Sequence, residues 1–466
     1  MRVVPISYTD PAAAFEAFAD EPVAALLQSC APDGPRGRYS YIAAEPYRLI
    51  VATSHGVMVD GEPVPGDPFT VLERELARVP DADGPCPVPF RTGAVGFLGY
   101  ELGRHLERLP VPRLLGPGQP EMVMGLYDTV IAFDHQEEKA YVISSGAPEV
   151  DSGARARRAA MRAHGFLHRL SGVNETPRTP DWTPQSAWQP DLDRTEVEER
   201  IARTIAYIRA GDIFQANITQ RFTARMPPDL GDRGLYARLR ALSPAPFAAL
   251  LTCGRAMAVA SASPERFLSL AADRWVETRP IKGTRPRHLD PAQDATLAAE
   301  LSASAKDRAE NLMIVDLMRN DLGRVAELGS VTVPVLNGLE TFASVHHLVS
   351  VVRARLREGL GPVDLLRATF PGGSITGAPK IRAMEIIHEL EPAPRGVYCG
   401  AIAWIGFDGA MDSSIVIRTL VRVGDTVMAQ AGGGIVADSD PAAEYEEGMV
   451  KIAPLLRAVA GPAPER

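Results

Sequence analysis

Three runs near the C-terminus decide the fold class: VYCGAIAWIGF (397–407), SSIVIRTL (413–420) and TVMAQAGGGIV (426–436). Each is rich in apolar and β-branched residues, which is typical of β-strands. Helical patterns flank this block, at about 379–390 and 441–458. Strands and helices therefore come in blocks and not in strict alternation, which predicts an α+β fold with a large, mostly antiparallel sheet core.

The overall composition limits the classes of protein to consider. The 466 residues are 45% hydrophobic and 23% charged, which is ordinary for a globular protein and suggests about two or three domains, or one interleaved core. The net charge of −9 argues against a nucleic-acid-binding protein, which needs a basic surplus. An anionic substrate would have to be held by a local cluster of Arg, Lys and backbone N–H groups, since the overall field repels it.

The cysteines and the N-terminus indicate the compartment. Cys30, Cys86, Cys253 and Cys399 are scattered, without C-x-x-C spacing, which excludes a zinc ribbon or thiol redox motif and suits a reducing environment. The N-terminal MRVVPISYTDP lacks the apolar segment of a signal peptide, and the chain contains no run of about 18 apolar residues. We therefore expect a cytoplasmic protein with no membrane span and no nucleic-acid partner.

Three regions follow one another along the chain. Residues 1–150 alternate short β-rich runs with turns. Residues 151–193 comprise an Ala- and Arg-rich helix, 153–170, and then a Pro-, Ser- and Thr-rich stretch that is expected to be an exposed linker. Residues 194–457 hold most motifs, including one long predicted helix at about 291–322. We expect this last region to be catalytic and to fold together with the N-terminal region.

One lysine, Lys282, stands at a Gly-Thr turn in a run of positive charge, RPIKGTRPR (279–287). One interpretation is a solvated basic loop, the usual role of such a run. The other is an amine whose pKa is lowered from about 10.4 by the neighbouring cations, which leaves it free to act as a nucleophile. These residues alone favour the solvated loop, so the rest of the chain must decide.

Two predicted helices carry carboxylates beside ammonium groups. In the last helix, Glu444, Glu447 and Lys451 lie at i, i+3 and i+7 and project from one side. In the long helix, Lys306 and Glu310 lie at i and i+4, and Glu310 borders an apolar stripe. Exposed helices with local Glu–Lys pairs would explain both patterns. The alternative is a Mg²⁺ site, because this ion takes one or two protein carboxylates and completes its octahedron with water and ligand oxygens.

Two glycine-rich motifs lack the residues that nucleotide binding requires. FPGGSITGAPK, from Phe370, opens like a P-loop, but Ala378 and Pro379 stand where Lys and Ser or Thr are needed. What remains is a turn that leads into a helix N-terminus, which suits a carboxylate. GAVGFLGYELG (93–103) has G-x-x-G-x-x-G spacing, which is not a dinucleotide fingerprint and is expected to allow close strand packing.

Further polar residues have both a structural and a functional interpretation. Glu265 in SPERFL follows a Ser-Pro turn; it is either a salt-bridge partner or a general acid, and the second role requires a poorly solvated site that raises its pKa. His346 and His347 are expected to belong to the core or to a polar network, with no third ligand to suggest zinc. Arg418 is a charge inside a predicted strand of β-branched residues, and a buried arginine demands an anionic partner.

Together these motifs resemble the chorismate-utilising enzymes, which include anthranilate, aminodeoxychorismate, isochorismate and salicylate synthases. The resemblance covers nearly the whole chain and is strongest from 194 to 457. It rests on ordered phrases: IFQANITQRF, SPERFL, PIKGTRPR, DRAENLMIVDLMRNDLGRV, FPGGSITGAPKIRAMEIIHELEP, RGVYCGAIAW, MDSSIVIRTL and AGGGIVADSDPAAEYEE. It implies two large, orthogonally packed antiparallel β-sheets that form a sandwich, with helices on the outside and the active site between the sheets.

The resemblance also gives the lysine a role. Anthranilate synthases typically have PIAGT where this chain has PIKGT, the form typical of aminodeoxychorismate synthases. It implies that Lys282 attacks C2 of chorismate while Glu265 protonates the departing C4 hydroxyl, and that ammonia then adds at C4 and expels the lysine. The product of this transaminase-type transferase would be 4-amino-4-deoxychorismate, for p-aminobenzoate and folate synthesis. Anthranilate synthesis is the alternative, and a non-catalytic amino-acid-binding regulator is a third interpretation.

Other site residues carry over from the family by position. Glu310 and Glu447 resemble ligands of a Mg²⁺ cofactor. Gln215 stands where the water-adding isochorismate enzymes carry a lysine base, which argues against water as the nucleophile. The residues that resemble substrate contacts are Gly283, Thr284, His347, Ser374, Tyr398, Arg418, Gly432, Gly433 and Lys451.

Two binding partners besides chorismate are implied. No cysteine lies in the Gly-x-Cys-x-Gly elbow of a glutamine amidotransferase, so ammonia is expected from a separate amidotransferase subunit or as the free molecule. LLQS (26–29), GRYSYIAAEP (37–46) and SPAPF (243–247) resemble the family's L-tryptophan pocket, with Gln28 in place of the Glu common in feedback-inhibited anthranilate synthases. The candidate tryptophan contacts are Ser29, Arg38, Tyr39, Ser40, Pro244, Ala245 and Pro246.

Overall fold

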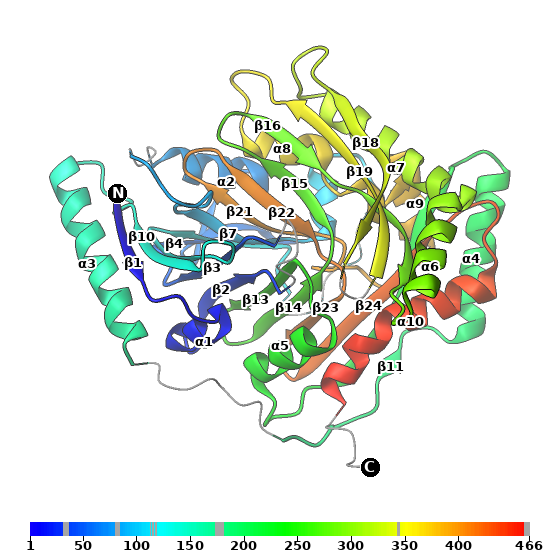
Figure 1. The fold of residues 1–466 in the computed structure, drawn as a ribbon, viewed down its shortest axis with the longest axis horizontal. Helices are drawn as coiled ribbons and strands as arrows, with labels where there is room; N and C mark the ends of the chain where they lie inside the picture. The colour runs from blue at the N-terminus through cyan, green and yellow to red at the C-terminus, as the bar shows by residue number, and fades with distance from the viewer. Residues whose placement is uncertain are drawn as a thin grey trace.

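The computed structural model describes residues 1–30, 37–79, 84–111, 113, 116, 119–172, 181–342 and 345–460. These residues form two β-sheets of 12 strands each, with helices around them (Figure 1). Every strand pair in both sheets is antiparallel. The predicted α+β class with two large antiparallel sheets is confirmed.

The first sheet combines strands from both ends of the chain. In spatial order it contains β1 (Arg2–Ile6), β10 (Lys139–Ser144), β9 (Thr129–Asp134), β3 (Tyr39–Ala44), β2 (Val23–Gln28), β13 (Phe247–Cys253), β14 (Met257–Ser263), β23 (Thr419–Val423), β24 (Thr426–Ile435), β12 (Gln215–Arg225) and β11 (Gln189–Pro190), with β20 (Gly377–Ala378) also paired to β12.

The second sheet is assembled in the same way. In spatial order it contains β17 (Ile281–Pro286), β19 (Val345–Arg355), β16 (Trp275–Thr278), β15 (Arg266–Leu270), β22 (Met411–Ile415), β21 (Ala401–Gly406), β7 (Gly93–Leu98), β8 (Met122–Tyr127), β4 (Arg48–Thr53), β5 (Gly56–Val59) and β6 (Glu62–Val64), with β18 (Thr332–Thr341) also paired to β19.

Helices cover the outer faces of the two sheets. The helices in the described residues are α1 (Pro11–Phe15), α2 (Pro68–Ala77), α3 (Ser152–Leu170), α4 (Arg194–Arg209), α5 (Gly231–Leu242), α6 (Pro291–Ala303), α7 (Ala305–Gly323), α8 (Pro362–Thr369), α9 (Lys380–Leu390) and α10 (Pro441–Val459), with the short 3₁₀ helices η1 (Glu16–Phe18), η2 (Tyr100–His105) and η3 (Gly373–Ile375).

The hydrophobic core lies in layers set by strand alternation. Tyr41 of the first sheet and Phe97 and Trp404 of the second belong to one buried cluster between the sheets. Leu98, the next residue after Phe97, points to the other face and packs in a cluster with α2, α7 and α8. A third cluster joins the outer face of the first sheet to α3, α5 and α10. Successive side chains alternate between two buried faces, so the sequences of these strands are almost continuously apolar.

The N-terminal and C-terminal regions share both sheets. Strand β2 pairs with β13 in the register Leu26↔Leu250, and β7 pairs with β21 in the register Phe97↔Ile402. The glycines of β7 permit this packing, because a Cβ at Gly96 would lie only 1.9 Å from the carbonyl oxygen of Val123. The expectation of close strand packing at this motif is confirmed.

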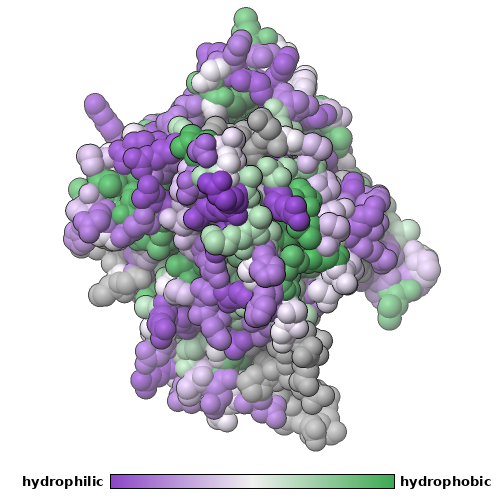
Figure 2. Space-filling model, turned by 90° about the vertical axis from the view of Figure 1, so that its left-hand side faces the viewer, coloured by the Kyte–Doolittle hydropathy of each residue, from purple (hydrophilic) through white to green (hydrophobic). Residues whose placement is uncertain are grey.

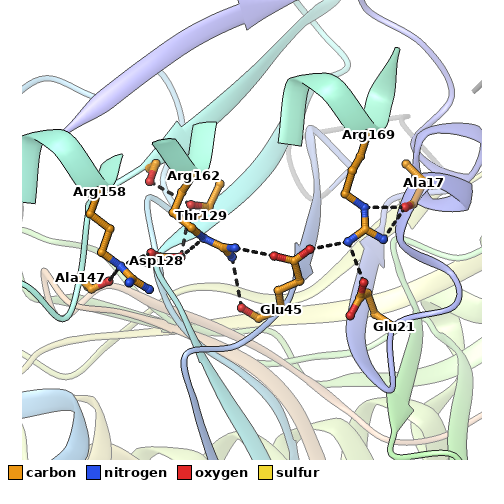
Figure 3. A network of polar contacts seen from close by, with 10 residues as sticks. Ala17, Glu21, Glu45, Asp128, Thr129, Ala147, Arg158, Arg162 and Arg169 are labelled. Carbon is orange, nitrogen blue, oxygen red and sulfur yellow. Dashed lines mark hydrogen bonds and ion pairs between the residues drawn. The ribbon is translucent and has the colours of Figure 1, made fainter. Parts of the chain in front are cut away.

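Helix α3 is held to the first sheet by charge as well as by apolar contact (Figure 3). Asp128, whose side chain is fully buried, accepts hydrogen bonds from Arg158 Nε at 2.9 Å and Arg162 Nε at 3.1 Å. Arg162 and Arg169 both pair with Glu45. The arginines of the predicted Ala- and Arg-rich helix thus bind acidic groups at the turns between strands.

Two predicted features differ in the structure. The long helix expected at 291–322 is two helices, since Ser304 has an extended backbone and caps α7 by accepting a hydrogen bond from Asp307 N. Part of the predicted linker, 173–180, lies outside the described residues. The described part is not simply exposed, because Trp182 is 8% exposed and donates to the carbonyl oxygen of Val459 in α10.

The face of the molecule on which α3 lies is mostly hydrophilic, with small groups of hydrophobic residues between the polar ones (Figure 2). Scattered exposed apolar residues are normal on protein surfaces and need no partner. Within the part of the chain that the structure describes, no helix combines the length and the hydrophobicity needed to cross a bilayer.

Candidate active site

Lys282 lies on a bulged strand and not in the tight turn that the sequence suggested. The register of β17 against β19 shifts between Lys282 and Thr284, where Gly283 has φ of 75°, a left-handed conformation that glycine adopts readily. A Cβ at Gly283 would lie 2.8 Å from Leu301 and 2.9 Å from Asp307. The bulge therefore requires glycine, and it sets the direction of the neighbouring lysine.

The arginines around Lys282 are paired with carboxylates, so other neighbours determine the pKa of Lys282. The pairs are Arg279 with Glu277 and Glu340, Arg285 with Asp307, and Arg287 with Asp294. The pKa of Lys282 is lowered, as the sequence suggested, but burial is the main cause, and the added cation is Lys451. Glu310, Glu265 and Glu447 oppose this shift. The interpretation in which the adjacent arginines lower the pKa of Lys282 is not supported, because carboxylate partners neutralise these arginines.

Glu265 occupies the connection between β14 and β15 and is 7% exposed. Its backbone carbonyl accepts a hydrogen bond from Ile415 N at 3.0 Å, which fixes the segment against β22. Burial raises the pKa of its side chain to about 7, although the Ser374 hydroxyl and the Lys282 ammonium both act to lower it. A carboxyl that remains partly protonated near neutral pH has the property that a general acid requires.

Three glutamates from two helices surround the ammonium groups. Glu310 comes from α7, and burial raises its pKa against the effect of Lys282 and Lys306. Glu444 accepts from Ser439 Oγ at 2.7 Å and lies 3.4 Å from Lys306 Nζ. Glu447 lies 2.7 Å from Lys451 Nζ; burial would raise the pKa of Glu447, but this ammonium lowers it overall.

The carboxylates suit a hard divalent cation only if the ligand supplies further oxygens. Among the described residues, no group of three or more acidic, histidine or cysteine side chains is arranged to hold a metal ion. Glu310 and Glu447 act on the same two ammonium groups, Lys282 and Lys306, so both carboxylates face one space. Two carboxylates with water and substrate oxygens form a typical Mg²⁺ site, and this donor set fits that ion.

The glycines of β24 bring backbone close to these charges. Lys451 Nζ donates to the carbonyl oxygen of Gly432 at 3.1 Å, and a Cβ at Gly432 would lie 1.9 Å from Ile218 O of β12. A Cβ at Gly433 would lie 3.2 Å from Glu444 Oε2 and 3.5 Å from Lys451 Nζ. The glycine run therefore forms a wall against which a small anionic ligand can lie.

Gln215, at the start of β12, lies beside the glycine run of β24 and close to Lys282. It has no exposed surface, and within the described residues neither atom of its amide has a hydrogen-bond partner. A Cβ at Gly434 would lie 2.4 Å from Gln215 Nε2 and 3.1 Å from Lys282 Nζ. An unpaired buried amide is costly unless a ligand satisfies it. Sequence analysis predicted no substrate contact for Gln215 and did not include Gly434. Gly434 could have been found, because it is the third glycine of the AGGG run and directly follows the predicted contacts Gly432 and Gly433.

Arg418 lies between β22 and β23 and not inside a strand as predicted. Its backbone has φ of 54°, which interrupts the apparent strand 413–420. Its Nη1 donates to the carbonyl oxygen of Lys451 at 3.0 Å. Burial lowers its pKa, while Tyr398 and Glu447 act in the opposite direction. The guanidinium thus lies beside Tyr398 and Lys451. Because its hydrogen bond goes to a neutral carbonyl, it can pair with an anionic ligand.

The two histidines have different surroundings. His346 is 2% exposed and bonds Thr341 at 2.9 Å and Asp294 at 3.0 Å, which confirms the polar network expected of it. His347 Nδ1 lies 2.9 Å from the hydroxyl of Thr284, its partner across β17 and β19. Because this pair adjoins the Lys282–Leu348 pair on the same two strands, the predicted substrate contacts Thr284 and His347 lie next to the lysine.

The predicted tryptophan contacts come together around β3, β2 and β13, which are neighbouring strands of the first sheet. Ser29 N donates to Ser40 Oγ at 3.0 Å, and Cys30 N donates to Ala245 O at 2.9 Å. Ser29 Oγ is buried without a hydrogen-bond partner in the described part of the chain. The three predicted segments are therefore neighbours.

A cavity of about 390 Å³ opens beside these segments, between the two sheets. Arg38, Tyr39 and Pro246 line it, whereas Pro244 is exposed. Its walls also contain Trp404 and an ion pair, Arg266 to Asp412 at 2.9 Å. The cavity is large enough for an amino-acid side chain, and its wall residue Arg266 follows Glu265 directly in the chain.

Comparison with known proteins shows which family the chain resembles. The family model of the chorismate binding enzyme matches residues 27–457. Aminodeoxychorismate synthase component 1 of Klebsiella aerogenes is 44% identical over 449 residues, which cover 95% of each chain. Anthranilate synthase component 1 of Streptomyces coelicolor is 42% identical over 458 residues, covering 94% of this chain and 86% of that protein.

A solved structure gives the same result for the fold. Anthranilate synthase component I from Streptococcus pneumoniae superposes with a TM-score of 0.79 at 32% identity, covering 91% of this chain and 93% of that one. Residues 27–457, which the family model matches, include strands of both sheets and every candidate residue of the catalytic group described above. The chain therefore belongs to the chorismate binding enzyme family.

Proposed function

We propose that this chorismate-utilising enzyme converts chorismate and ammonia to 4-amino-4-deoxychorismate, a precursor of p-aminobenzoate and folate. The observation that carries the proposal is Lys282, an amine whose pKa burial lowers, beside the buried carboxyl of Glu265. The similarity to aminodeoxychorismate synthase component 1 over most of the chain supports the same reaction.

The first step forms a covalent intermediate. The neutral Lys282 amine attacks C2 of chorismate, the two ring double bonds shift, and the C4–O bond breaks. Glu265 gives its proton to the departing hydroxyl, which leaves as water, so the lysine nitrogen carries a positive charge and Glu265 a negative one. The pKa of about 7 at Glu265 supports its role as the acid in this step.

The second step reverses the first with a different nucleophile. Ammonia adds at C4, the ring double bonds shift back, and the C2–N bond breaks, so Lys282 leaves as a neutral amine. The new C4 ammonium group passes one proton to the Glu265 carboxylate. The sum is chorismate plus ammonia to 4-amino-4-deoxychorismate plus water, with the enolpyruvyl group intact. Gln215, buried beside Lys282 with an unpaired amide among the described residues, is positioned to orient the incoming ammonia.

The substrate carboxylates are assigned to two groups of residues. Glu310 and Glu447 would hold Mg²⁺, which when bound supplies positive charge to the ring carboxylate. Lys451 and the backbone of Gly432 and Gly433 line the same space. Arg418 and Tyr398 are assigned to the enolpyruvyl carboxylate, and Thr284, His347 and Ser374 to the ring and its hydroxyl. The acidic chain thus offers a local basic pocket to a dianion.

The ammonia is proposed to come from a glutamine amidotransferase subunit. Relatives of this chain are named component 1, which implies a second component. Free ammonium salts at high concentration would replace it in an assay, as the proposed chemistry needs only ammonia.

Anthranilate synthesis is the second candidate, because anthranilate synthase components are almost as similar to this chain. In that reaction ammonia would enter directly at C2, where Lys282 competes for the same carbon. The lysine therefore favours the first candidate.

A product assay tests the choice between the two. Chorismate, Mg²⁺ and ammonium chloride are incubated with the purified chain, and products are separated by liquid chromatography with mass detection. We expect 4-amino-4-deoxychorismate with its enolpyruvyl group retained. Fluorescent anthranilate, formed without an added lyase, would reverse the assignment.

We also propose that the inter-sheet cavity binds L-tryptophan. The cavity volume of about 390 Å³, the aromatic wall and the Arg266–Asp412 pair support an amphoteric aromatic ligand. Gln28 is already engaged with Tyr236 at 2.8 Å and with Asp10, so its substitution for Glu favours weaker binding of the ligand ammonium. Calorimetric titration with tryptophan, with phenylalanine for comparison, tests this proposal, and the absence of binding heat would refute it.

A further inference from the structure

Lys306 occupies an electrostatically unfavourable position. It is the second residue of α7, directly after the N-cap Ser304 and Ala305. The N-terminus of a helix carries partial positive charge from its unpaired N–H groups, so it favours anions and disfavours cations. Asp307 follows this preference, whereas Lys306 does not. A nearby source of negative charge must therefore hold the ammonium in place.

That negative charge comes from Glu310, a proposed metal ligand, and from Glu444. Lys306 Nζ lies 3.4 Å from Glu444 Oε1 on α10 and 3.9 Å from Glu310 Oε1 on its own helix. Both carboxylates are largely buried, with side-chain exposures of 7% and 12%, while the lysine side chain is 51% exposed. The ammonium therefore reaches the buried acids from the solvent side.

Lys451, another ammonium beside the proposed metal site, is held differently. It lies 2.7 Å from Glu447 and also donates to the carbonyl oxygen of Gly432, and its side chain is 29% exposed. Lys451 is thus fixed on the strand wall by a backbone contact as well as an ion pair, whereas the two contacts of Lys306 are ion pairs with Glu310, a proposed metal ligand, and Glu444. Of the two, Lys306 has the freedom to leave.

We propose that Lys306 is an internal counter-ion of this site, which neutralises Glu310 and Glu444 until a divalent cation binds and then moves out to solvent. The inference rests on the proposed function, in which Glu310 and Glu447 hold Mg²⁺. A divalent cation within a few ångströms of an ammonium would repel it, and the Lys306 side chain, which is 51% exposed, can move away into solvent. Binding of the metal must then displace the lysine, which lowers the affinity of the substrate-free protein for Mg²⁺. Chorismate offsets this by adding its own carboxylate to the site.

Direct titration of Mg²⁺ into the substrate-free full-length protein tests the inference without an activity readout. Wild type, Lys306→Gln and Lys306→Arg are compared by isothermal titration calorimetry and by the rise in Tm on adding Mg²⁺. Arg319→Gln is the matched control, because Arg319 lies on the same helix, is 53% exposed and pairs with Asp316 outside the site. We expect Lys306→Gln to bind Mg²⁺ about tenfold more tightly and to gain more Tm, while the other two variants behave as wild type.

The outcomes separate this inference from the proposed function. Unchanged or weaker Mg²⁺ binding by Lys306→Gln, with measurable binding by wild type, overturns the counter-ion role and leaves the reaction in place. Tighter binding by Arg319→Gln as well would also overturn it, since any cation on α7 would then have the same effect. Failure of wild type to bind Mg²⁺ even with chorismate present would remove the metal site itself, and with it both proposals about that site.

Discussion

Gln215 and Lys282 meet over a single glycine, since a Cβ on Gly434 would lie 2.4 Å from Gln215 Nε2 and 3.1 Å from Lys282 Nζ. The glutamine comes from β12 of the first sheet and the lysine from β17 of the second. The proposed nucleophile and a neutral amide are therefore brought together by the packing of two sheets, and the space between them depends on the absence of one methyl group.

Gly434→Ala is expected to reduce activity strongly without unfolding the protein. The added Cβ collides with the side-chain amide of Gln215 and displaces Lys282; misplacement of a reacting group by about 1 Å costs on the order of a hundredfold in rate. Steady-state kinetics with chorismate and ammonium, together with thermal melting, measure the effect. Gly165→Ala in α3 is the control, because this glycine is exposed and its added methyl meets no atom within 4 Å beyond its own helix; equal loss in both variants would contradict the prediction.

Lys282→Ala is expected to slow 4-amino-4-deoxychorismate formation by on the order of a thousandfold, since the nucleophile is removed. Lys282→Arg keeps the charge but not a usable amine, and should be equally slow. Intact-protein mass spectrometry of the wild type, mixed with chorismate in the absence of ammonia, should reveal an adduct that both variants lack. Normal turnover by either variant would exclude the covalent route.

The reaction needs Glu265 protonated and Lys282 neutral, so kcat/KM should pass through a maximum as the pH changes, and one limb should have the pKa of about 7 of Glu265. The other limb should follow the loss of a proton from Lys282, whose pKa is lowered by burial. Glu265→Gln should be slower by about 10²–10⁴-fold and lose the limb near pH 7. A limb near pH 7 that persists in this variant would assign it to another group.

The same carboxyl should make stability depend on pH. Its pKa is about 7 in the folded protein against an ordinary value of 4.5, so the protonated form favours folding. Its contribution is fully present below about pH 4.5 and is lost as the pH rises through about 7. Denaturant unfolding of wild type and Glu265→Gln between these pH values should show a difference that changes with pH; a constant difference would contradict the raised pKa.

Glu310→Gln and Glu447→Gln are each expected to weaken Mg²⁺ and chorismate binding together, because both carboxylates serve one coupled site. Calorimetric titration of each ligand with and without the other measures this coupling. Glu446→Gln is a matched control on α10, since its side chain is 61% exposed and pairs with Arg194. Undiminished Mg²⁺ binding by both site variants would remove them as ligands.

Asp128→Ala is expected to destabilise the fold by about 3 kcal/mol, because it leaves Arg158 and Arg162 without their buried partner. Urea unfolding measures the change. Under conditions in which the variant stays folded it should keep its kcat, because α3 lies on the opposite side of the molecule from α7 and α10 (Figure 1). Arg157→Ala, exposed on the same helix, should change stability by less than about 0.5 kcal/mol.

Local patterns in the sequence were sufficient for much of the fold. The apolar, β-branched runs from 397 to 436 predicted strands in a block, and β21, β22, β23 and β24 lie there. The prediction was wrong where a break depended on one residue, as with Ser304 between α6 and α7 and Arg418 between β22 and β23. Such breaks come from a cap or a single backbone dihedral angle, which side-chain periodicity does not record.

The catalytic candidates were named from motifs, but their states were decided by packing. The sequence by itself determined that Lys282, Glu265, Glu310 and Glu447 are present in family motifs. Burial lowered the pKa of Lys282 and raised that of Glu265. The sequence had instead suggested that neighbouring arginines lower the pKa of Lys282. Only the tertiary structure decided which charges meet, as between Lys306 of α7 and Glu444 of α10, because electrostatic and desolvation energies depend on distance in space and not on separation along the chain.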